Sequence, residues 1–181
     1  QVPRGNVSAA TVRHLQKMNS QPVNEKLVSL WGVIRPESRD KAALTARRKR
    51  MLSREFLAGA DLPSGRAIYS RTCAASHTLF GDGAKIGPDI TGSNRANLDY
   101  ILENILEPSA LVEKAYQLTI VQTEDGRIIS GLLAEQSDDT VTIQTQNERI
   151  ILPTGDIDTM KRTPVSMMPE GLLKELKDAE V

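Results

Sequence analysis

One pentapeptide of this 181-residue chain, Cys73-Ala74-Ala75-Ser76-His77, combines a thiol and an imidazole at a spacing that suits haem chemistry. In the c-type attachment motif Cys-x-x-Cys-His, two thiols add to the haem vinyl groups, and the following histidine reaches the iron. Ser76 stands where the second cysteine would be, and a serine hydroxyl is too poor a nucleophile to form the thioether. The motif therefore predicts at most one covalent link, through Cys73, with His77 as the proximal iron ligand.

The same two side chains allow other interpretations. A lone helical cysteine is commonly a small buried hydrophobe, and a lone histidine is commonly a hydrogen-bonded structural residue. Cys73 and His77 lie four residues apart, so they share a helical face and could form a thiol nucleophile with its base. Nothing else in the sequence suggests a hydrolase, and we expect no enzyme activity. A zinc site is not expected, because the chain has one cysteine and two distant histidines, His14 and His77.

A methionine far downstream could complete the coordination of the iron. His/Met ligation is common in electron-transfer haems, because the thioether favours ferrous iron and raises the potential. Met167-Met168-Pro169 offers the sulfur, and the proline would stiffen the loop that presents it. A proximal histidine also needs an acceptor for its other ring nitrogen, and the turn Ile86-Gly87-Pro88 follows His77 at a suitable reach. Core packing for the methionines and an ordinary turn for Gly87-Pro88 remain the structural alternatives.

The elements that must position these residues are mostly helical. Apolar residues recur at helical spacing in six stretches. We expect helices at 7–18 with Ser8 as cap, from Asn24 to Ile34, from about Ser38 to Met51, from Ser64 to Cys73, from Asn97 to Leu106, and through Leu172, Leu173 and Leu176, with Asp178 capping one more. From about 116 to 160 the period changes to two, and Asp125-Gly126 is typical of a hairpin turn. The sequence thus predicts a mainly α fold with a small inserted antiparallel meander, similar in pattern to Sm-like barrels.

The composition excludes several classes of partner. Lys plus Arg equals Asp plus Glu, at 23 each, so the formal net charge is zero, and neither nucleic acid nor membrane insertion is expected. The basic run from Arg47 to Arg50 is expected to be a solvated helix face. No apolar stretch approaches the length of a membrane-spanning helix. The chain begins at Gln1 without a signal peptide, which favours a processed or partial chain.

Four motifs together resemble one protein family: Gly65–Tyr69, Cys73–Gly81, Ile86–Arg95 and Ser166–Leu172. They are similar to the Pirellula/Verrucomicrobium-type haem-binding domain. That domain is a cytochrome c module at the C-terminus of large exported planctomycete proteins described as membrane-bound dehydrogenases. The resemblance covers about Gly65 to Val181. The stretch from Asn24 to Gly32 also resembles the end of the helical-repeat region that precedes the module.

The resemblance implies a fold, a cofactor and a role. Residues 1–60 would end a helical-repeat region, and 61–181 would form a cytochrome c-like domain with an Sm/SH3-like β insertion at about 116–160. Cys73 would carry a single thioether to haem c, or the haem would be held without a covalent bond. His77 and Met168 would bind the iron, with Met167 as the near alternative and Pro88 as the acceptor for His77. The expected function is electron transport for a fused dehydrogenase or a redox partner protein, in the periplasm or another exported compartment.

Two departures from the family favour an alternative function. Ser76 replaces the second cysteine, and the family's last helix, which packs on the first cytochrome helix, would follow Val181. A degenerate, haem-less protein-interaction or scaffold module would tolerate both departures.

Overall fold

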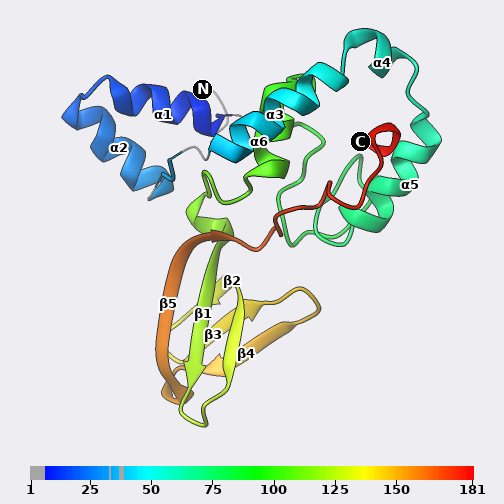
Figure 1. Ribbon diagram of the computed structural model, residues 1–181. Coiled ribbons are helices and arrows are strands. Elements are labelled where there is room, and N and C mark those ends of the chain that lie inside the picture. The colour runs from blue at the N-terminus through cyan, green and yellow to red at the C-terminus, as the bar shows by residue number, and fades with distance from the viewer. Residues whose placement is uncertain (1–6, 33, 37–38) are drawn as a thin grey trace.

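The computed structural model describes residues 7–32, 34–36 and 39–181, and within them the chain forms a helical part and a sheet (Figure 1). The helices are α1 (Ala9–Lys17), α2 (Gln21–Trp31), α3 (Arg39–Met51), α4 (Arg54–Ala58), α5 (Leu62–Thr72) and α6 (Leu98–Leu106). The strands are β1 (Gln117–Thr123), β2 (Ile128–Gln136), β3 (Thr140–Gln144), β4 (Arg149–Pro153) and β5 (Ile157–Ser166). Short 3-10 turns lie at η2 (Lys114–Tyr116), η3 (Thr154–Asp156) and η4 (Asp178–Glu180).

The prediction of a mainly α fold is wrong. The chain is 39% helical and 22% strand, with six helices and a five-stranded antiparallel sheet in the described residues, which makes it a mixed α/β protein. Two segments account for the difference. The last strand continues to Ser166, beyond the predicted limit at about 160, and the predicted helix through Leu172, Leu173 and Leu176 consists of turns and bends.

Two predicted helix starts are confirmed by their capping hydrogen bonds. The Ser8 hydroxyl accepts from the Thr11 amide at 3.1 Å, and the Asn97 side chain accepts from the Tyr100 amide at 3.1 Å. Each cap satisfies an amide that has no partner inside its helix. The start predicted at Ser38 lies outside the described residues.

Two other predicted starts are wrong. α2 begins at Gln21 and includes Pro22, because proline is tolerated in the first turn of a helix, where its missing amide costs nothing. The predicted cap at Asn24 therefore lies inside the helix. α5 begins at Leu62, because Asp61 accepts from the Ser64 amide and so caps the helix one turn before the predicted start at Ser64.

The sheet has its own apolar core. Its strand order is β4-β3-β2-β1-β5, with every neighbouring pair antiparallel. Along β1 alternate residues are buried, so the period of two seen in the sequence reflects one face turned toward the core. The core consists of Val121, Ile129, Val141, Ile143 and Leu152. Gln117 at the start of β1 pairs with Ser166 at the end of β5, so the chain re-enters the helical part where it left it (Figure 1).

A glycine in the middle of β2 permits close packing of β2 on β3. A Cβ at Gly131 would lie 2.4 Å from the Gln144 carbonyl oxygen and 2.6 Å from the Ile143 Cγ2 atom. Gly131→Ala is therefore expected to lower the free energy of unfolding by about 1–3 kcal/mol, the usual cost of overpacking, measured by urea denaturation. Gly155→Ala is the matched control, because a Cβ there meets nothing within 4 Å. Equal stability of the two variants would contradict the close packing.

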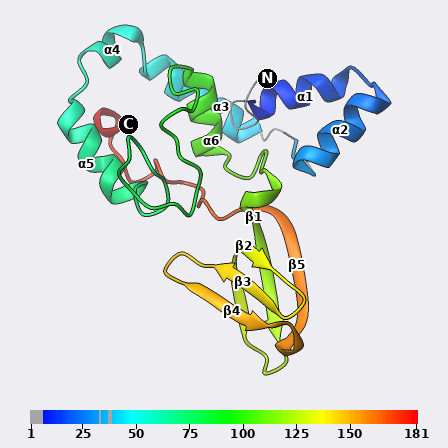
Figure 2. The same ribbon diagram turned by 180° about the vertical axis from the view of Figure 1, so that it is seen from behind.

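Two further clusters lie in the helical part, on either side of the turn that joins α6 to β1. Val12, Leu27 and Trp31 hold α1 against α2, with Leu111 packed on them. Leu52, Leu102 and Leu106 hold the end of α3 against α6, with Leu173 and Val181 packed on them. The α1–α2 pair and the α4–α5 arm extend in opposite directions from this centre (Figure 2). Among the described helices, none is long and apolar enough to cross a membrane.

Candidate functional site

The imidazole of His77 is held on one edge and on one face. Its Nδ1 lies 2.9 Å from the Pro88 carbonyl oxygen. A carbonyl oxygen only accepts, so Nδ1 carries a proton, and in the neutral imidazole the free lone pair is then the one on Nε2. The ring also packs directly on Gly87, where a Cβ would lie 2.6 Å from Cε1 and 2.9 Å from Nδ1. The turn Gly87-Pro88 therefore fixes both the tautomer and the orientation of the ring.

The backbone beneath His77 is held by several hydrogen bonds. The Tyr69 hydroxyl donates to the His77 carbonyl at 2.7 Å, and the His77 amide donates to the Cys73 carbonyl at 2.9 Å. Gly83 has φ +111° and approaches the His77 carbonyl so closely that a Cβ on Gly83 would lie 2.1 Å from the His77 oxygen. The Gly87 amide donates to the Ser76 carbonyl at 2.7 Å, which closes the loop beside the imidazole. This loop of residues 74–97, here called the histidine loop, presents His77 in one conformation.

Cys73 ends α5, one helical turn before His77. Its amide donates to the Tyr69 carbonyl at 2.8 Å, so α5 fixes the place of the thiol. The thiol is free and half-buried, and burial raises its pKa. A raised pKa keeps the thiol protonated at neutral pH, and a nucleophilic cysteine needs the thiolate. The raised pKa of Cys73 therefore does not favour a thiol nucleophile activated by His77.

The arm that carries these residues has no apolar core of its own. Every residue from 53 to 101 is described, and among them Thr78 alone is buried. Leu62 and Phe80 are 77% and 63% exposed, and the larger aliphatic side chains that are half-buried include Ile68, Leu79, Ile86 and Ile90. A segment of this length ordinarily folds around buried apolar side chains. Its apolar surface is therefore available to a large apolar group that binds beside His77.

Charged side chains border the exposed end of the histidine loop. The Arg95 guanidinium lies 4.8 Å from the centre of the Phe80 ring and donates to the Thr91 carbonyl at 2.9 Å. Arg66 pairs with Asp82, and its guanidinium lies 5.7 Å from the centre of the Tyr69 ring. Such cation–π contacts keep guanidinium groups next to apolar surface. The guanidinium groups of Arg66 and Arg95 therefore lie beside the apolar side chains of this segment.

The structure places Cys73 at the end of α5, directly before the histidine loop that carries His77 and Pro88, but holds the two methionines on a separate segment. Met167 and Met168 are half-buried at the start of residues 167–181, here called the C-terminal segment. The Met168 amide donates to the Ser166 hydroxyl at 3.1 Å. None of the polar contacts among the described residues joins either methionine to the histidine loop.

Three ion pairs fasten the C-terminal segment to two helices, α3 and α5. Ion pairs join Lys41 to Glu170 at 2.7 Å, Arg48 to Asp178 at 2.7 Å and Arg71 to Glu180 at 3.4 Å. The first two cations come from α3 and the third from α5. The segment that carries the methionines is thus tied to the same α5 helix that ends at Cys73.

Two cavities lie away from His77. One of about 180 Å³ is lined by Arg35, Pro36, Lys41, Glu107, Ser109, Ala110 and Glu170, and one of about 350 Å³ by Arg13, Gln16, Lys17 and Pro36. Within the described part of the chain, no three His, Cys, Asp or Glu side chains gather as a metal site. A ligand set built on such residues alone therefore has no location in the described structure.

Several contacts of the site could not be predicted from the sequence. The packing of His77 on Gly87 and the bond from Tyr69 to the His77 carbonyl both follow from the three-dimensional path of the loop. The only available signal was local, since Tyr69 precedes Cys73 by one helical turn and Gly87 precedes Pro88. The bond between Ser109 and Ser166, which supports the backbone of Met168, left no sequence signal because 57 residues separate the two serines.

Neither a scan of protein-family models nor a search of curated proteins found a match for this chain.

Proposed function

We propose that this chain is a haem-binding electron-transfer module of the c-type. The observation that carries the proposal is the geometry of His77. Its Nδ1 is used by Pro88 and its ring rests on Gly87, which leaves Nε2 as the nitrogen that can bind iron. Metal-binding histidines commonly donate their other ring N–H to such an acceptor, which orients the ring and raises its basicity.

The remaining residues fit a haem in three respects. Cys73 lies one turn before His77, with a protonated thiol placed by the end of α5. The apolar side chains of residues 53–101 are exposed or half-buried and can cover the faces of a macrocycle. Met168, with Met167 as the alternative, offers a thioether sulfur from the C-terminal segment, which ion pairs hold against α3 and α5.

A haem bound here would supply one-electron exchange at its iron. The residues of the chain would hold it, orient the imidazole through Pro88 and exclude water with the apolar arm. A Met168 ligand would favour the ferrous form. The module would turn over no substrate itself and would pass electrons between a fused or partner dehydrogenase and an acceptor.

The test is the visible absorption spectrum of the chain co-expressed with a c-type maturation system, followed by acid–acetone extraction. The expected result is a Soret band whose colour stays with the precipitated protein, because one thioether joins the haem to Cys73. Colour that passes into the extract would mean that ligation and packing alone hold the haem. The absence of any Soret band would refute the proposal.

Replacement of the one cysteine separates covalent from non-covalent attachment. Cys73→Ala is expected to keep a Soret band, because His77 is unchanged, but to release its colour into acid–acetone, because no thioether remains. Ser76→Cys is the matched control, since it restores the second cysteine of the motif and should retain the colour in the pellet. Colour that stays in the pellet for Cys73→Ala would show that the attachment lies elsewhere.

The second candidate function is a haem-less interaction module in an exported protein. Ser76 favours it, and so do the exposed apolar side chains Ile128 and Ile151 of the sheet, at 70% and 67%. The sheet has a complete core of its own and could serve as a binding surface without any cofactor. A colourless, folded chain after co-expression would support this candidate.

A further inference from the structure

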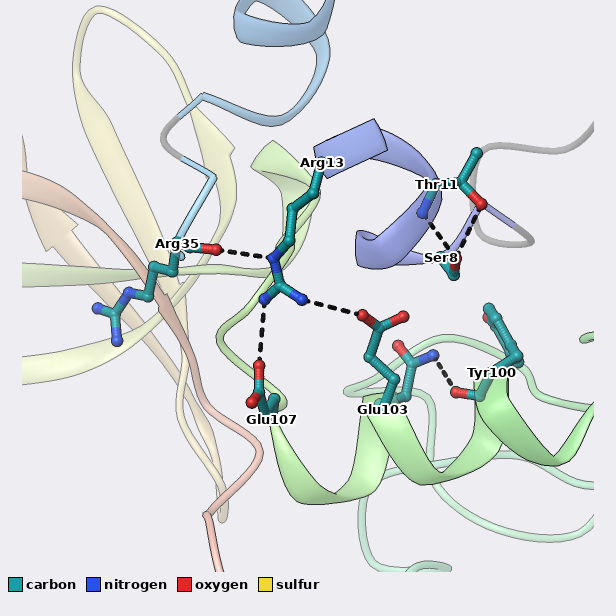
Figure 3. Close-up of polar contacts among 8 residues, drawn as sticks. Ser8, Thr11, Arg13, Arg35, Tyr100, Glu103 and Glu107 are labelled. Atoms are coloured by element: carbon teal, nitrogen blue, oxygen red, sulfur yellow. Dashed lines mark hydrogen bonds and ion pairs between the residues drawn. The ribbon is translucent and has the colours of Figure 1, made fainter. Parts of the chain in front are cut away.

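A single arginine of α1 ties three parts of the chain together. Arg13 Nε donates to the Arg35 carbonyl at 3.0 Å, and its two terminal nitrogens donate to Glu103 at 3.3 Å and Glu107 at 3.1 Å (Figure 3). The three side chains of the two ion pairs are only 14%, 15% and 11% exposed. This group of contacts, here called the arginine clasp, fixes the α1–α2 pair on the C-terminal end of α6.

The clasp holds the chain on both sides of Ser109. Glu107 precedes Ser109 by two residues and is gripped directly by Arg13. Arg35, whose carbonyl Arg13 also holds, donates its own amide to the Ala110 carbonyl at 3.3 Å, one residue after Ser109. Ser109 is itself buried, at 6% exposure. The position of its hydroxyl therefore depends on how α1 is docked.

Ser109 in turn holds Ser166, the last residue of β5, directly before the C-terminal segment. Its hydroxyl accepts from the Ser166 amide at 3.1 Å, and the Ser166 hydroxyl accepts from the Met168 amide at 3.1 Å. These two bonds run without a break from the end of α6 to the backbone of Met168.

A second path joins the same places. The Gln117 side chain is buried and donates to the carbonyls of Trp31 and Val112, at 3.1 Å each. Gln117 is also the residue of β1 that pairs with Ser166. The C-terminal end of α2, through the Gln117 side chain, and the last residue of β5, through strand pairing, therefore meet at one residue.

We propose that the turn from Glu107 to Val112 is a shared anchor, through which docking of the α1–α2 pair sets the position of Met168 and so regulates the sulfur ligand of the haem site. The regulatory part rests on the proposed function. Ser109 and Ser166 are positioning residues, and Arg13 acts on Met168 only through them.

The test is amide hydrogen exchange on the full chain without haem. Arg13→Ala is expected to raise the exchange rates of the Ser166 and Met168 amides by about tenfold or more, because both lose their fixed acceptors when the anchor loosens. Val141 and Ile143 in the sheet core serve as internal references and should not change. Arg149→Ala is the matched control, since it removes an exposed ion pair with Glu135 on the far side of the sheet.

Each outcome decides the question. Faster exchange at Ser166 and Met168 with unchanged references supports the anchor, whereas faster exchange confined to α1 and α2 overturns it. If Arg13→Ala also speeds exchange at the reference amides of Val141 and Ile143, the milder variant Arg13→Lys replaces it. Lysine keeps the charge but loses the forked contact, and the same comparison of Ser166 and Met168 with the references then applies. Ser109→Ala must release the Met168 amide while Val12 in α1 stays protected, and the anchor is refuted if Met168 does not respond.

A spectroscopic readout separates the two proposals. In haem-loaded chain, Ser109→Ala is expected to weaken the sulfur-to-iron charge-transfer band while the Soret band of the His77 complex remains. A chain that takes up no haem but shows coupled exchange refutes the proposed function and keeps the anchor. A chain that binds haem through His77 and Met168 without coupled exchange refutes the anchor alone.

Discussion

Replacement of His77 by alanine is expected to abolish specific haem binding. Loss of an outer partner of a metal ligand typically costs about 10–100-fold in affinity, and loss of the ligand itself should cost more. Removing the imidazole also removes the group that Pro88 and Gly87 hold in place. The measurement is a titration of haemin into chain prepared without the maturation system, followed at the Soret band. The variant should show only the broad absorption of unligated haemin.

Two variants make this result specific. His14→Ala removes the only other histidine, which is exposed on α1, and should bind haemin like the parent chain. Gly87→Ala should weaken binding by about 10–100-fold, because a Cβ 2.6 Å from Cε1 must turn the ring away from its bond to Pro88. Parent-like affinity in His77→Ala would exclude His77 as the iron ligand, and an equal loss in His14→Ala would show that any histidine suffices.

Contacts between residues close together in the chain could be predicted from the sequence. His77 and Pro88 are 11 residues apart, and a glycine-proline turn can bring a carbonyl back to a preceding imidazole. The capping residues Ser8 and Asn97 were predictable for the same reason, since each acts on an amide three residues away. The choice between Asp61 and Ser64 as the cap of α5 was not predictable, because both residue types are good caps and only the path of the chain decides which one acts.

The long-range part of the structure left no comparable signal. Arg13 lies 90 residues from Glu103, and nothing in the sequence distinguishes it from the other cations of the chain. The C-terminal leucines have helical spacing, yet Leu173 packs on the α3–α6 cluster without forming a helix. Gly171, with φ +82°, lies in the turns that replace the expected helix. Here tertiary contacts override helical periodicity, which is why the predicted balance of helix and strand was wrong.

Arg13→Ala is expected to lower the free energy of unfolding of the helical part by about 1–3 kcal/mol, because removing one partner of part-buried, charge-assisted hydrogen bonds leaves the other partners unsatisfied. The side chains of Glu103 and Glu107 are 15% and 11% exposed, so the variant leaves two carboxylates buried together without a cation. The measurement is urea denaturation followed by helical circular dichroism. Arg149→Ala should cost at most about 1 kcal/mol, because its ion pair is exposed.

A neutral replacement of the whole clasp should recover most of this loss. In Arg13→Met/Glu103→Gln/Glu107→Gln no unpaired charge is buried, and buried ion pairs contribute little beyond such neutral packing. A triple variant as unstable as Arg13→Ala would show that the defect is lost packing of the arginine stem, and the electrostatic account of the clasp would fail.

The pH dependence of stability shows whether the cost of burying Glu103 or its attraction to Arg13 is larger. Burial raises the pKa of Glu103, whereas Arg13 and the amides of Ala9 and Ala10 lower it and Glu107 raises it slightly. A carboxyl whose pKa is raised by folding contributes its full stability below its unfolded pKa. That stability is lost as the pH rises through the folded pKa. Acid should therefore not open the clasp through Glu103. In Arg13→Ala the Glu103 carboxyl has lost its cation and can take up a proton, so the destabilisation should be largest at pH 7 and shrink toward about pH 4. A parent chain that loses stability in acid, and no longer does so in Glu103→Gln, would mean that attraction to Arg13, rather than the cost of burial, dominates the energetics of Glu103.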